Sequence, residues 1–407
     1  MSYTPIKAGN KDAFGRLRVC NPASLLEISH VIDKDDIAES EVITGGATCV
    51  LTSNTTYLTL AVSTTGDDVK RRSRDRGIYE PGKSQLVYMS GVLNVGGNND
   101  TGVISKIGNY DETSGLYFKH TGDGAGGTLS VVIRTSTTGS VTETEVSQPS
   151  FNQDVLDGTG KSGITLDTSK TQIFMIDFEW LGVGRVRMSL VIDGEIIPVH
   201  NFIHANSATV PYMTRPSLPL SYEIGSTVAS ASGSMLFNCG TILSEGGHLP
   251  IGRQFSISNG ITTKAIGTTI EPIICLRLKS TNLNTIGQVA HLSLTAIDNN
   301  NFAFYVYIFR DVADTSFLTG QSWVSADTDS SVEYDLSATA ITTTNGHLIG
   351  TGHITGDNGI ELHDKQSNNL HLTSNISGIS DIIVLAAQGF TGNARDVVGS
   401  ISWDEYF

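Results

Sequence analysis

The chain has 407 residues, a length at which two or three domains of ordinary size are expected. Hydrophobic residues make up 39% and charged residues 16%, and 43 glycines accompany abundant Ser, Thr and Asn. This is typical of β-rich proteins with tight turns and excludes a mainly helical one. The formal net charge of −15 repels nucleic acid, so we expect no DNA-packaging or DNA-reading role.

The N-terminal residues lack the apolar core of a signal peptide, and no run of about 18 apolar residues marks a membrane span. We therefore expect a protein made in a cytoplasm, without a cleavable signal or membrane contact. The four cysteines are far apart and form no CxxC pair, which argues against a zinc site or a dense disulfide framework. We expect no metal or cofactor, and four buried, reduced thiols: Cys20, Cys49, Cys239 and Cys275.

Residues 1–30 mix Pro, Gly and charged residues without a helical period and predict an extended N-terminal arm. Alternating segments rich in Thr and Val begin near residue 40, separated by turn residues such as TTGDD and VGGNND. They predict a concanavalin-like or jelly-roll-like β-sandwich over residues 31–250. The Gly-rich stretch 244–260 predicts a linker. Further strands, including NFAFYVYIF, predict a second β-sandwich over residues 251–407.

The most informative stretch is FEWLGVGRVRMSLVIDGEIIPVHNF, residues 178–202. The strand that leads into it, TQIFMIDFEWL, is apolar on both faces, so we expect it to be central in its sheet. Asp193 and Gly194 suit the positive φ angles of a type I′ hairpin turn. Because Pro198 cannot donate a ladder hydrogen bond, the return strand is expected at an edge or with a bulge.

The same hairpin resembles those of concanavalin-like jelly rolls, a family that includes lectins, laminin-G modules and some glycosidases. Asp177 and Glu179 lie two residues apart and share a face of their strand, as the carboxylates of a glycosidase could. However, Arg185 and Arg187 lie on the next strand and offer ion-pair partners. We therefore interpret both carboxylates as structural.

Two other patterns have ordinary structural explanations. His200 and His204 have the spacing of a helical zinc pair, but they lie at a strand end, where this spacing is too wide for one metal. GDGAGG, residues 122–127, lacks the Lys-Ser/Thr and the helix of a phosphate loop, so we interpret it as a hairpin turn. With no Ser-His-Asp order, GxSxG motif or Cys-His pair, we expect no enzymatic activity.

KRRSRDR, residues 70–76, is the only basic cluster in the sequence. The overall acidic charge argues against contact with nucleic acid, so we interpret the cluster as a patch that docks an acidic neighbouring subunit. Its basic residues are Lys70, Arg71, Arg72, Arg74 and Arg76.

Several long blocks resemble one known family. They are KDAFGRLRVCNPASLLE (11–27), YEPGKSQLVYMSGVL (79–93), SKIGNYDETSGLYF (105–118), FNQDVLDGTGKSGITLDTSKTQIFMIDFEWLGVGRVRMSLVIDG (151–194), NFIHANSATVPYMTRPSLPLSYEI (201–224) and SEGGHLPIG (244–252). The family is that of virion structural proteins of marine and cyanobacterial tailed phages. The match covers most of residues 11–252 and is looser beyond. Cys20 stands where Ser is expected, and Leu26-Glu27 where Phe-Asp is commoner. The resemblance implies a component of the virion.

The family signature is densest in FGRLR, residues 14–18. We expect Phe14, Arg16 and Arg18 to grip a partner as an assembly arm, because arginine and aromatic residues contribute most interface energy. Gly15 is expected to let the backbone approach that partner. The alternative is that the arm pairs as an edge strand with its own sandwich.

These observations together predict a non-enzymatic structural protein on the outside of a tailed-phage virion, as a capsid decoration or a tail or fibre component. An internal protein facing packaged DNA should carry basic patches, which the charge of −15 argues against. The expected partners are other virion proteins and further copies of the chain, as a trimer. The alternative is a lectin-like receptor-recognition protein that binds or cleaves a host surface glycan.

Overall fold

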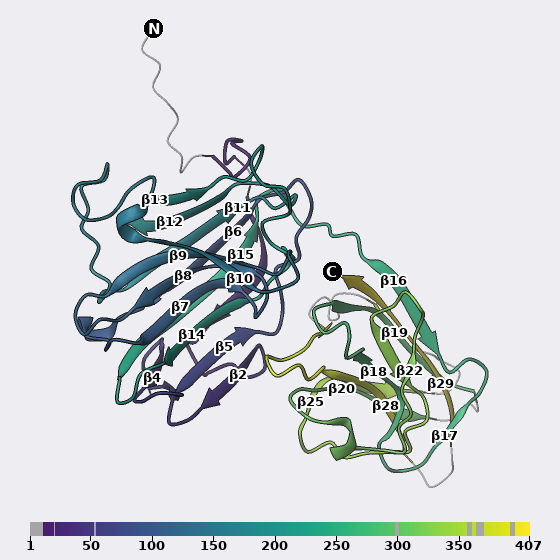
Figure 1. Cartoon of the computed structure of the whole chain (residues 1–407). Helices are drawn as coiled ribbons and strands as arrows, with labels where there is room; N and C mark the ends of the chain where they lie inside the picture. Colours follow the sequence, from purple (N-terminus) through teal and green to yellow (C-terminus); the bar gives the residue numbers. More distant parts are fainter. Residues whose placement is uncertain are drawn as a thin grey trace. The chain divides into compact units, whose positions relative to one another are not determined.

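The computed structural model describes residues 11–19, 21–52, 54–297, 301–355, 360–363, 370–390 and 395–407. The chain divides into two compact units, Met1–Pro250 and Ile251–Phe407. Within the described residues, helix is limited to three 3₁₀ turns: η2 (Val95–Gly97), η3 (Gln148–Ser150) and η4 (Asp314–Ser316). All other regular structure is β-strand, which confirms the expected all-β class (Figure 1).

The first unit contains two antiparallel sheets. One has the order β13 (Glu195–Phe202), β12 (Val186–Ile192), β11 (Gln172–Phe178), β6 (Gln85–Val92), β15 (Gly233–Ser244), β4 (Leu58–Val62) and β3 (Thr48–Leu51), with β1 (Ala23–Ser29) also paired to β15. The other has the order β10 (Thr142–Ser147), β9 (Thr128–Thr135), β8 (Gly115–Thr121), β7 (Val103–Tyr110), β14 (Leu220–Ser226), β5 (Asp68–Ser73) and β2 (Glu39–Thr44).

The two sheets of the first unit pack face to face as a β-sandwich (Figure 1). Residues at every second position point inward, as the period of a β-strand requires. Phe174, Ile176 and Phe178 of β11 enter this core from one sheet, and Leu116 and Phe118 of β8 enter it from the other. The rings of Phe118 and Phe174 lie 5.0 Å apart across the interior. The predicted jelly-roll-like sandwich is therefore confirmed.

The hairpin of β12 and β13 matches its prediction in detail. Asp193 and Gly194 have φ angles of 50° and 79°, as a type I′ turn requires. Strand β11 is central, between β12 and β6, while β13 lies at the sheet edge. A register shift next to Pro198 places a bulge in β13. The bulge and the edge position remove the need for the N–H group that proline lacks.

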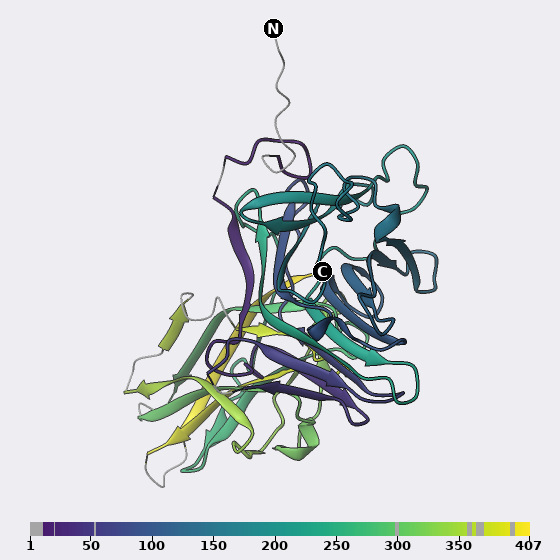
Figure 2. The same ribbon diagram turned by 90° about the vertical axis from the view of Figure 1, so that its left-hand side faces the viewer.

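The N-terminal arm needs a correction. Residues 1–10 lie outside the described residues, but β1 (Ala23–Ser29) forms an edge strand along β15 of its own sandwich, where Ile28 is buried in the core. The purple strand in Figure 2 shows this course. The arm is thus not free up to residue 30, because its last residues satisfy backbone groups of β15. This was the alternative arrangement for these residues.

One thiol also departs from expectation. Cys49 and Cys275 are buried and free, but Cys239 is exposed, and Cys20 lies outside the described residues. Met235 and Phe237 of β15 point into the core, and a register shift follows directly after Phe237. The extra residue reverses the alternation, so that Cys239 faces outward beside Ser90, with 3.3 Å between Sγ and Oγ.

The second unit is a β-sandwich of two six-stranded sheets. One contains β16 (Arg253–Ser258), β29 (Arg395–Tyr406), β19 (Ile286–Ala296) and β26 (Ile360–His363), with β17 (Lys264–Ile266) and β27 (His371–Leu372) alongside. The other has the order β22 (Val324–Ser325), β23 (Val332–Asp335), β18 (Glu271–Leu278), β28 (Ile382–Gly389), β20 (Phe302–Phe309) and β25 (Gly346–Ile354). A small pair, β21 (Leu318–Thr319) and β24 (Ala340–Ile341), completes the unit. Its core contains Leu276 of β18 and Trp403 of β29.

Candidate functional site: the arm contact and the Asp111 loop

The described arm begins with a compact turn. The backbone N–H of Asp12 donates to the carbonyl of Arg16 at 2.8 Å, and that of Gly15 donates to the carbonyl of Asp12 at 2.9 Å. Gly15 has a φ of 81°, and among the described residues no atom beyond its two chain neighbours lies within 4 Å of where its Cβ would be. Within this chain the glycine therefore serves the turn and not a close backbone approach.

Arg18 reaches from the arm onto the outer face of the sheet that contains β11. Its Nε donates to Oε1 of Glu245 at 2.6 Å, and its Nη2 donates to Asp177. Asp177 also pairs with Arg187, and Glu245 accepts a 2.9 Å hydrogen bond from Ser84. We call Arg18, Ser84, Asp177, Arg187 and Glu245 the arm-contact cluster. Its two guanidinium groups balance its two carboxylates.

Two further bonds hold the arm to the same face. Arg187 donates to the carbonyl of Lys11 and Arg185 to the carbonyl of Ala13, both at 2.6 Å. Burial and the nearby charge of Arg18 lower the pKa of Arg187 to about 10, which leaves it charged at neutral pH. Residues 11–18 are therefore fixed to their own sandwich by charged side chains.

The candidate carboxylate pair has a structural role. The Asp177 side chain has no exposed surface and is occupied by Arg18 and Arg187. Glu179 lies beyond the end of β11 and accepts the backbone N–H of Arg185 at 3.2 Å. A buried, ion-paired Asp177 cannot approach a glycosidic bond. The expected cross-strand pairing is present for Asp177 and Arg187.

The three residues expected to grip a partner lie in different environments. Arg18 forms ion pairs with Asp177 and Glu245 of its own sandwich, which corrects its assignment as a contact residue for a partner. The Arg16 guanidinium lies 4.8 Å from the ring centre of Phe14 and also pairs with Asp12 at 2.6 Å. Half of the Arg16 side chain is exposed. Phe14 and Arg16 remain predicted contact residues.

The basic cluster is not a surface patch, which corrects its interpretation as a docking site. Its four arginines are buried, and its members lie against carboxylates and carbonyls of the first unit. Lys70 pairs with Glu223 at 3.3 Å, Arg71 with Glu39 at 2.9 Å, Arg72 with Glu112 at 2.6 Å and Arg76 with Asp111 at 3.1 Å, while Arg74 donates to the Asp36 carbonyl at 3.4 Å. These partners lie far from residues 70–76 in the sequence. The sequence of this segment alone therefore does not reveal that its charges are paired.

Arg71 points into the sandwich because it shares the inward face of β5 with Val69. There it forms a buried network with Glu39, His30 and Tyr222. Tyr222 Oη lies 3.0 Å from Nε of Arg71 and 3.1 Å from Nε2 of His30. Burial, reinforced by Arg71, lowers the pKa of His30 to about 4, so the ring is neutral at physiological pH.

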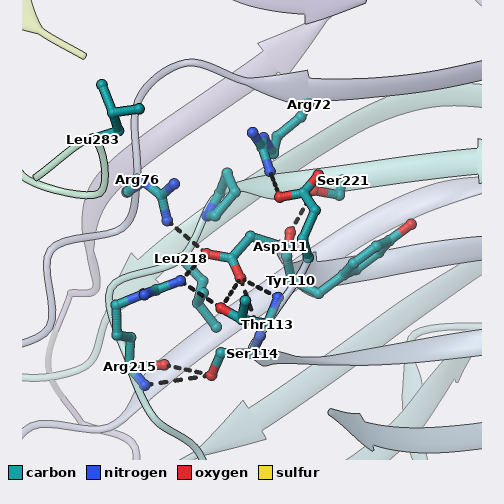
Figure 3. Close-up of polar contacts among 12 residues, drawn as sticks. Arg72, Arg76, Tyr110, Asp111, Thr113, Ser114, Arg215, Leu218, Ser221 and Leu283 are labelled. Carbon is teal, nitrogen blue, oxygen red and sulfur yellow. Dashed lines mark hydrogen bonds and ion pairs between the residues drawn. The ribbon is translucent and has the colours of Figure 1, made fainter. Parts of the chain in front are cut away.

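Arg76 leads to a second network on the loop between β7 and β8 (Figure 3). Oδ2 of Asp111 accepts hydrogen bonds from Arg76 at 3.1 Å and Arg215 at 2.8 Å. Its Oδ1 accepts the N–H groups of Thr113 at 2.9 Å and Ser114 at 3.0 Å. Burial raises the pKa of Asp111, but the two guanidinium groups and these donors outweigh it, so the pKa lies well below its usual range. These contacts hold the loop that connects the end of β7 to the start of β8.

The two histidines are structural, as interpreted. Nδ1 of His200 accepts the backbone N–H of Asn152 at 3.3 Å, while His204 stacks on Tyr212 with ring centres 4.2 Å apart. Burial lowers the pKa of both. No group of three metal-ligating side chains occurs within the described ranges. GDGAGG connects β8 and β9 as the expected hairpin turn, with Asp123 accepting N–H groups from Ala125 and Gly127.

Sequence reasoning missed the long-range partners of these residues. Nothing in the sequence marks Glu245 as the partner of Arg18, 227 residues away, or Arg215 as a partner of Asp111. The one usable signal was charge balance. A cluster of five basic residues within seven positions, in a chain of net charge −15, has many carboxylates available for pairing.

No family model matches the chain, and no curated protein matches it. Among solved structures, the legume lectin-like domain from Entamoeba histolytica is 8% identical, with 55% of this chain and 98% of that one covered and a TM-score of 0.34. The CBM2 module of the evolved Dit of Lactobacillus casei BL23 phage J-1 is 7% identical, with 56% and 98% covered and a TM-score of 0.35. An endo-1,3-beta-glucanase from Streptomyces sioyaensis is 10% identical, with 60% and 99% covered and a TM-score of 0.34. Similarities this distant show nothing about the chemistry of this chain.

Within the part of the chain that the structure describes, no helix has the length and apolarity needed to span a membrane.

Proposed function

We propose that the chain is a non-enzymatic structural protein of a tailed-phage virion, located on the outside of the particle. The observation that carries the proposal is that four of the six blocks that resemble the phage family meet at one place. Arg18 comes from the block at 11–27, Ser84 from 79–93, Asp177 and Arg187 from 151–194, and Glu245 from 244–252. All of them meet in the arm-contact cluster.

This convergence gives four of the six blocks a shared structural role. Each of the four contributes a charged or polar group that would be costly to bury alone, and Arg18 and Glu245 find their partners only in other blocks. The blocks therefore specify a framework and the position of the arm. A catalytic signature would instead leave its carboxylates accessible, whereas Asp177 is fully buried.

The distribution of charge supports an external position. The arginines of residues 70–76 are buried within the first unit, so they offer no basic surface for packaged DNA. The net charge of −15 also disfavours DNA contact. Assembly would use Phe14 and the half-exposed Arg16, which lie at the tip of the arm turn. We propose a trimer as the assembled form, since closed symmetry is usual for such proteins.

The test is quantitative mass spectrometry of purified particles of the encoding phage, combined with antibody labelling under the electron microscope. We expect the chain in a fixed copy number divisible by three, with label on the particle exterior. Absence from washed particles would contradict the virion role. If the isolated chain released oligosaccharides from host polysaccharide, the non-enzymatic assignment would be wrong.

A further inference from the structure

The second unit contains a pocket that the virion role does not explain. It has a volume of about 340 Å³ and opens at the edge of the sheet where β18 and β20 end and β23 and β28 begin. This volume lies at the lower end of the range for small-molecule sites, about 300–1,000 Å³, so it suits one ring and not an extended ligand.

Hydrogen bonds between the surrounding loops give the pocket a fixed shape. Asn375 donates to Oδ1 of Asp311 at 2.5 Å, and Ser374 donates to the carbonyl of Leu283 at 2.7 Å. The backbone N–H of Leu278 donates to Ser380 Oγ at 2.8 Å. The turn at 374–380 is thus tied to the two loops facing it. A pocket formed before binding loses less entropy when a ligand enters.

The lining combines apolar and polar side chains. Its apolar part includes the buried Ile382 and the aliphatic side chains of Leu283, Val312 and Ile379. Its polar part includes Arg277 and Glu333, where Nε of Arg277 donates to Oε2 of Glu333 at 3.0 Å across neighbouring strands. This ion pair is partly exposed, with 29% and 26% of the two side chains accessible.

A tryptophan ring packs against the arginine of this pair. The Arg277 guanidinium lies 4.3 Å from the ring centre of Trp323, a cation–π contact that restricts its rotation. The ion pair presents a cation and an anion side by side with no net charge. A guanidinium donates hydrogen bonds and a carboxylate accepts them, so the pair combines both kinds of group in the pocket lining.

We propose that this pocket binds a single neutral sugar ring of a glycan. A pyranose has an apolar C–H face that matches the aliphatic side chains, and hydroxyl groups that both donate and accept, which match the Arg277–Glu333 pair. A charged ligand would have to compete with Arg277 or Glu333 for its ion-pair partner. A purely apolar ligand would displace water from the ion pair and form no hydrogen bonds in its place, which costs free energy.

The test measures binding of methyl glycosides of glucose, galactose, mannose and N-acetylglucosamine to the full chain, by ligand-observed NMR at millimolar concentration. At least one should bind. Glu333→Gln removes an anionic acceptor, and Ile379→Trp fills the cavity. Glu333→Gln should weaken binding by about tenfold or more, the effect of losing a hydrogen bond to a charged group. Ile379→Trp should weaken it at least as much, because the indole ring takes the space of the sugar ring.

Glu143→Gln is the matched control. Glu143 forms a similar cross-strand pair with Arg134 at 2.8 Å in the first unit, far from the pocket in sequence. It should leave binding unchanged, and all three variants should keep the wild-type circular dichroism spectrum. The proposal is overturned if no glycoside binds, if the pocket variants bind as well as wild type, or if an apolar peptide displaces the sugar. None of these results bears on the presence of the chain in virions, so the two proposals can fail separately.

Discussion

Arg18 and Asp177 are 159 residues apart in sequence, yet the guanidinium of Arg18 donates directly to the buried carboxylate of Asp177. The contact joins the N-terminal arm to the central strand of its own sheet. It turns a residue that appears, from sequence, to be available for a partner into part of the framework of the sandwich.

Arg18→Met should therefore destabilise the first unit. Glu245 would lose its ion-pair partner while buried, and Asp177 would keep only Arg187. Breaking a buried pair in this way costs about 3 kcal/mol of unfolding free energy. Urea unfolding of the full chain, followed by tryptophan fluorescence, measures the change.

Lys170→Met is the control for this experiment. Lys170 and Asp167 are 4.0 Å apart and mostly exposed, so the same loss of charge should change stability by less than about 0.5 kcal/mol. Equal effects for the two variants would mean that the arm contact contributes nothing beyond an ordinary surface pair.

The buried His30 should make stability depend on pH. Burial and Arg71 lower its pKa to about 4, against the opposing influence of Asp33 and Asp35. The unfolded chain takes up a proton near pH 6.5, whereas the folded chain does so only near pH 4. The histidine therefore disfavours the folded state progressively as pH falls from 6.5 to 4, by about 3 kcal/mol in total.

Comparison with His30→Gln removes the histidine titration, while carboxylates that do not contact His30 titrate alike in both proteins. Glu39, whose Oε2 lies 3.3 Å from Nε2 of His30, titrates in the same range because burial raises its pKa to about 7, so the difference between the proteins reports on the pair of His30 and Glu39. Unfolding free energies measured at half-unit steps from pH 7.5 to 4 should show wild type losing stability relative to the variant below pH 6.5. A constant difference across this range would mean that His30 titrates alike in the folded and unfolded chain.

Thiol reactivity should follow the reversed alternation of β15. Cys239 is exposed and should react with a maleimide within minutes. Burial raises the pKa of Cys49 to about 12 and that of Cys275 still further, so both should remain unmodified in the folded chain. Peptide mass spectrometry after a short pulse identifies the labelled site, and Cys239→Ser should abolish the signal at that peptide. Resistance of Cys239 to labelling in the folded chain would contradict the bulge after Phe237.

The I′ turn gives a prediction about a single glycine. Gly194 has a φ of 79°, which a residue with a Cβ adopts at a cost, so Gly194→Ala should lower stability by about 1 kcal/mol. Gly126→Ala should be neutral or slightly stabilising, because Gly126 has an ordinary φ and open space around its Cβ position. Thermal unfolding of both variants provides the comparison, and an effect of the same size at the two positions would contradict the conformational argument.

The sequence by itself determined what depends on neighbours along the chain. Alternating apolar residues and turn residues predicted an all-β chain with two sandwiches, and Asp193-Gly194 and Pro198 predicted a turn and an edge strand that the structure confirms. These features follow from the two-residue period of a strand and from local backbone preferences.

Only the tertiary structure decided where the charges go. Three arginines pair with carboxylates from distant segments, and each pairing depends on sheet order and register. The pairs are Arg18 with Glu245, Arg76 with Asp111, and Arg71 with Glu39. A single bulge after Phe237 exposed Cys239, against the simple alternation. The pocket beside Arg277 likewise arises from loops that meet only in the folded unit. Such contacts are long-range, and no local pattern specifies which two distant segments will meet.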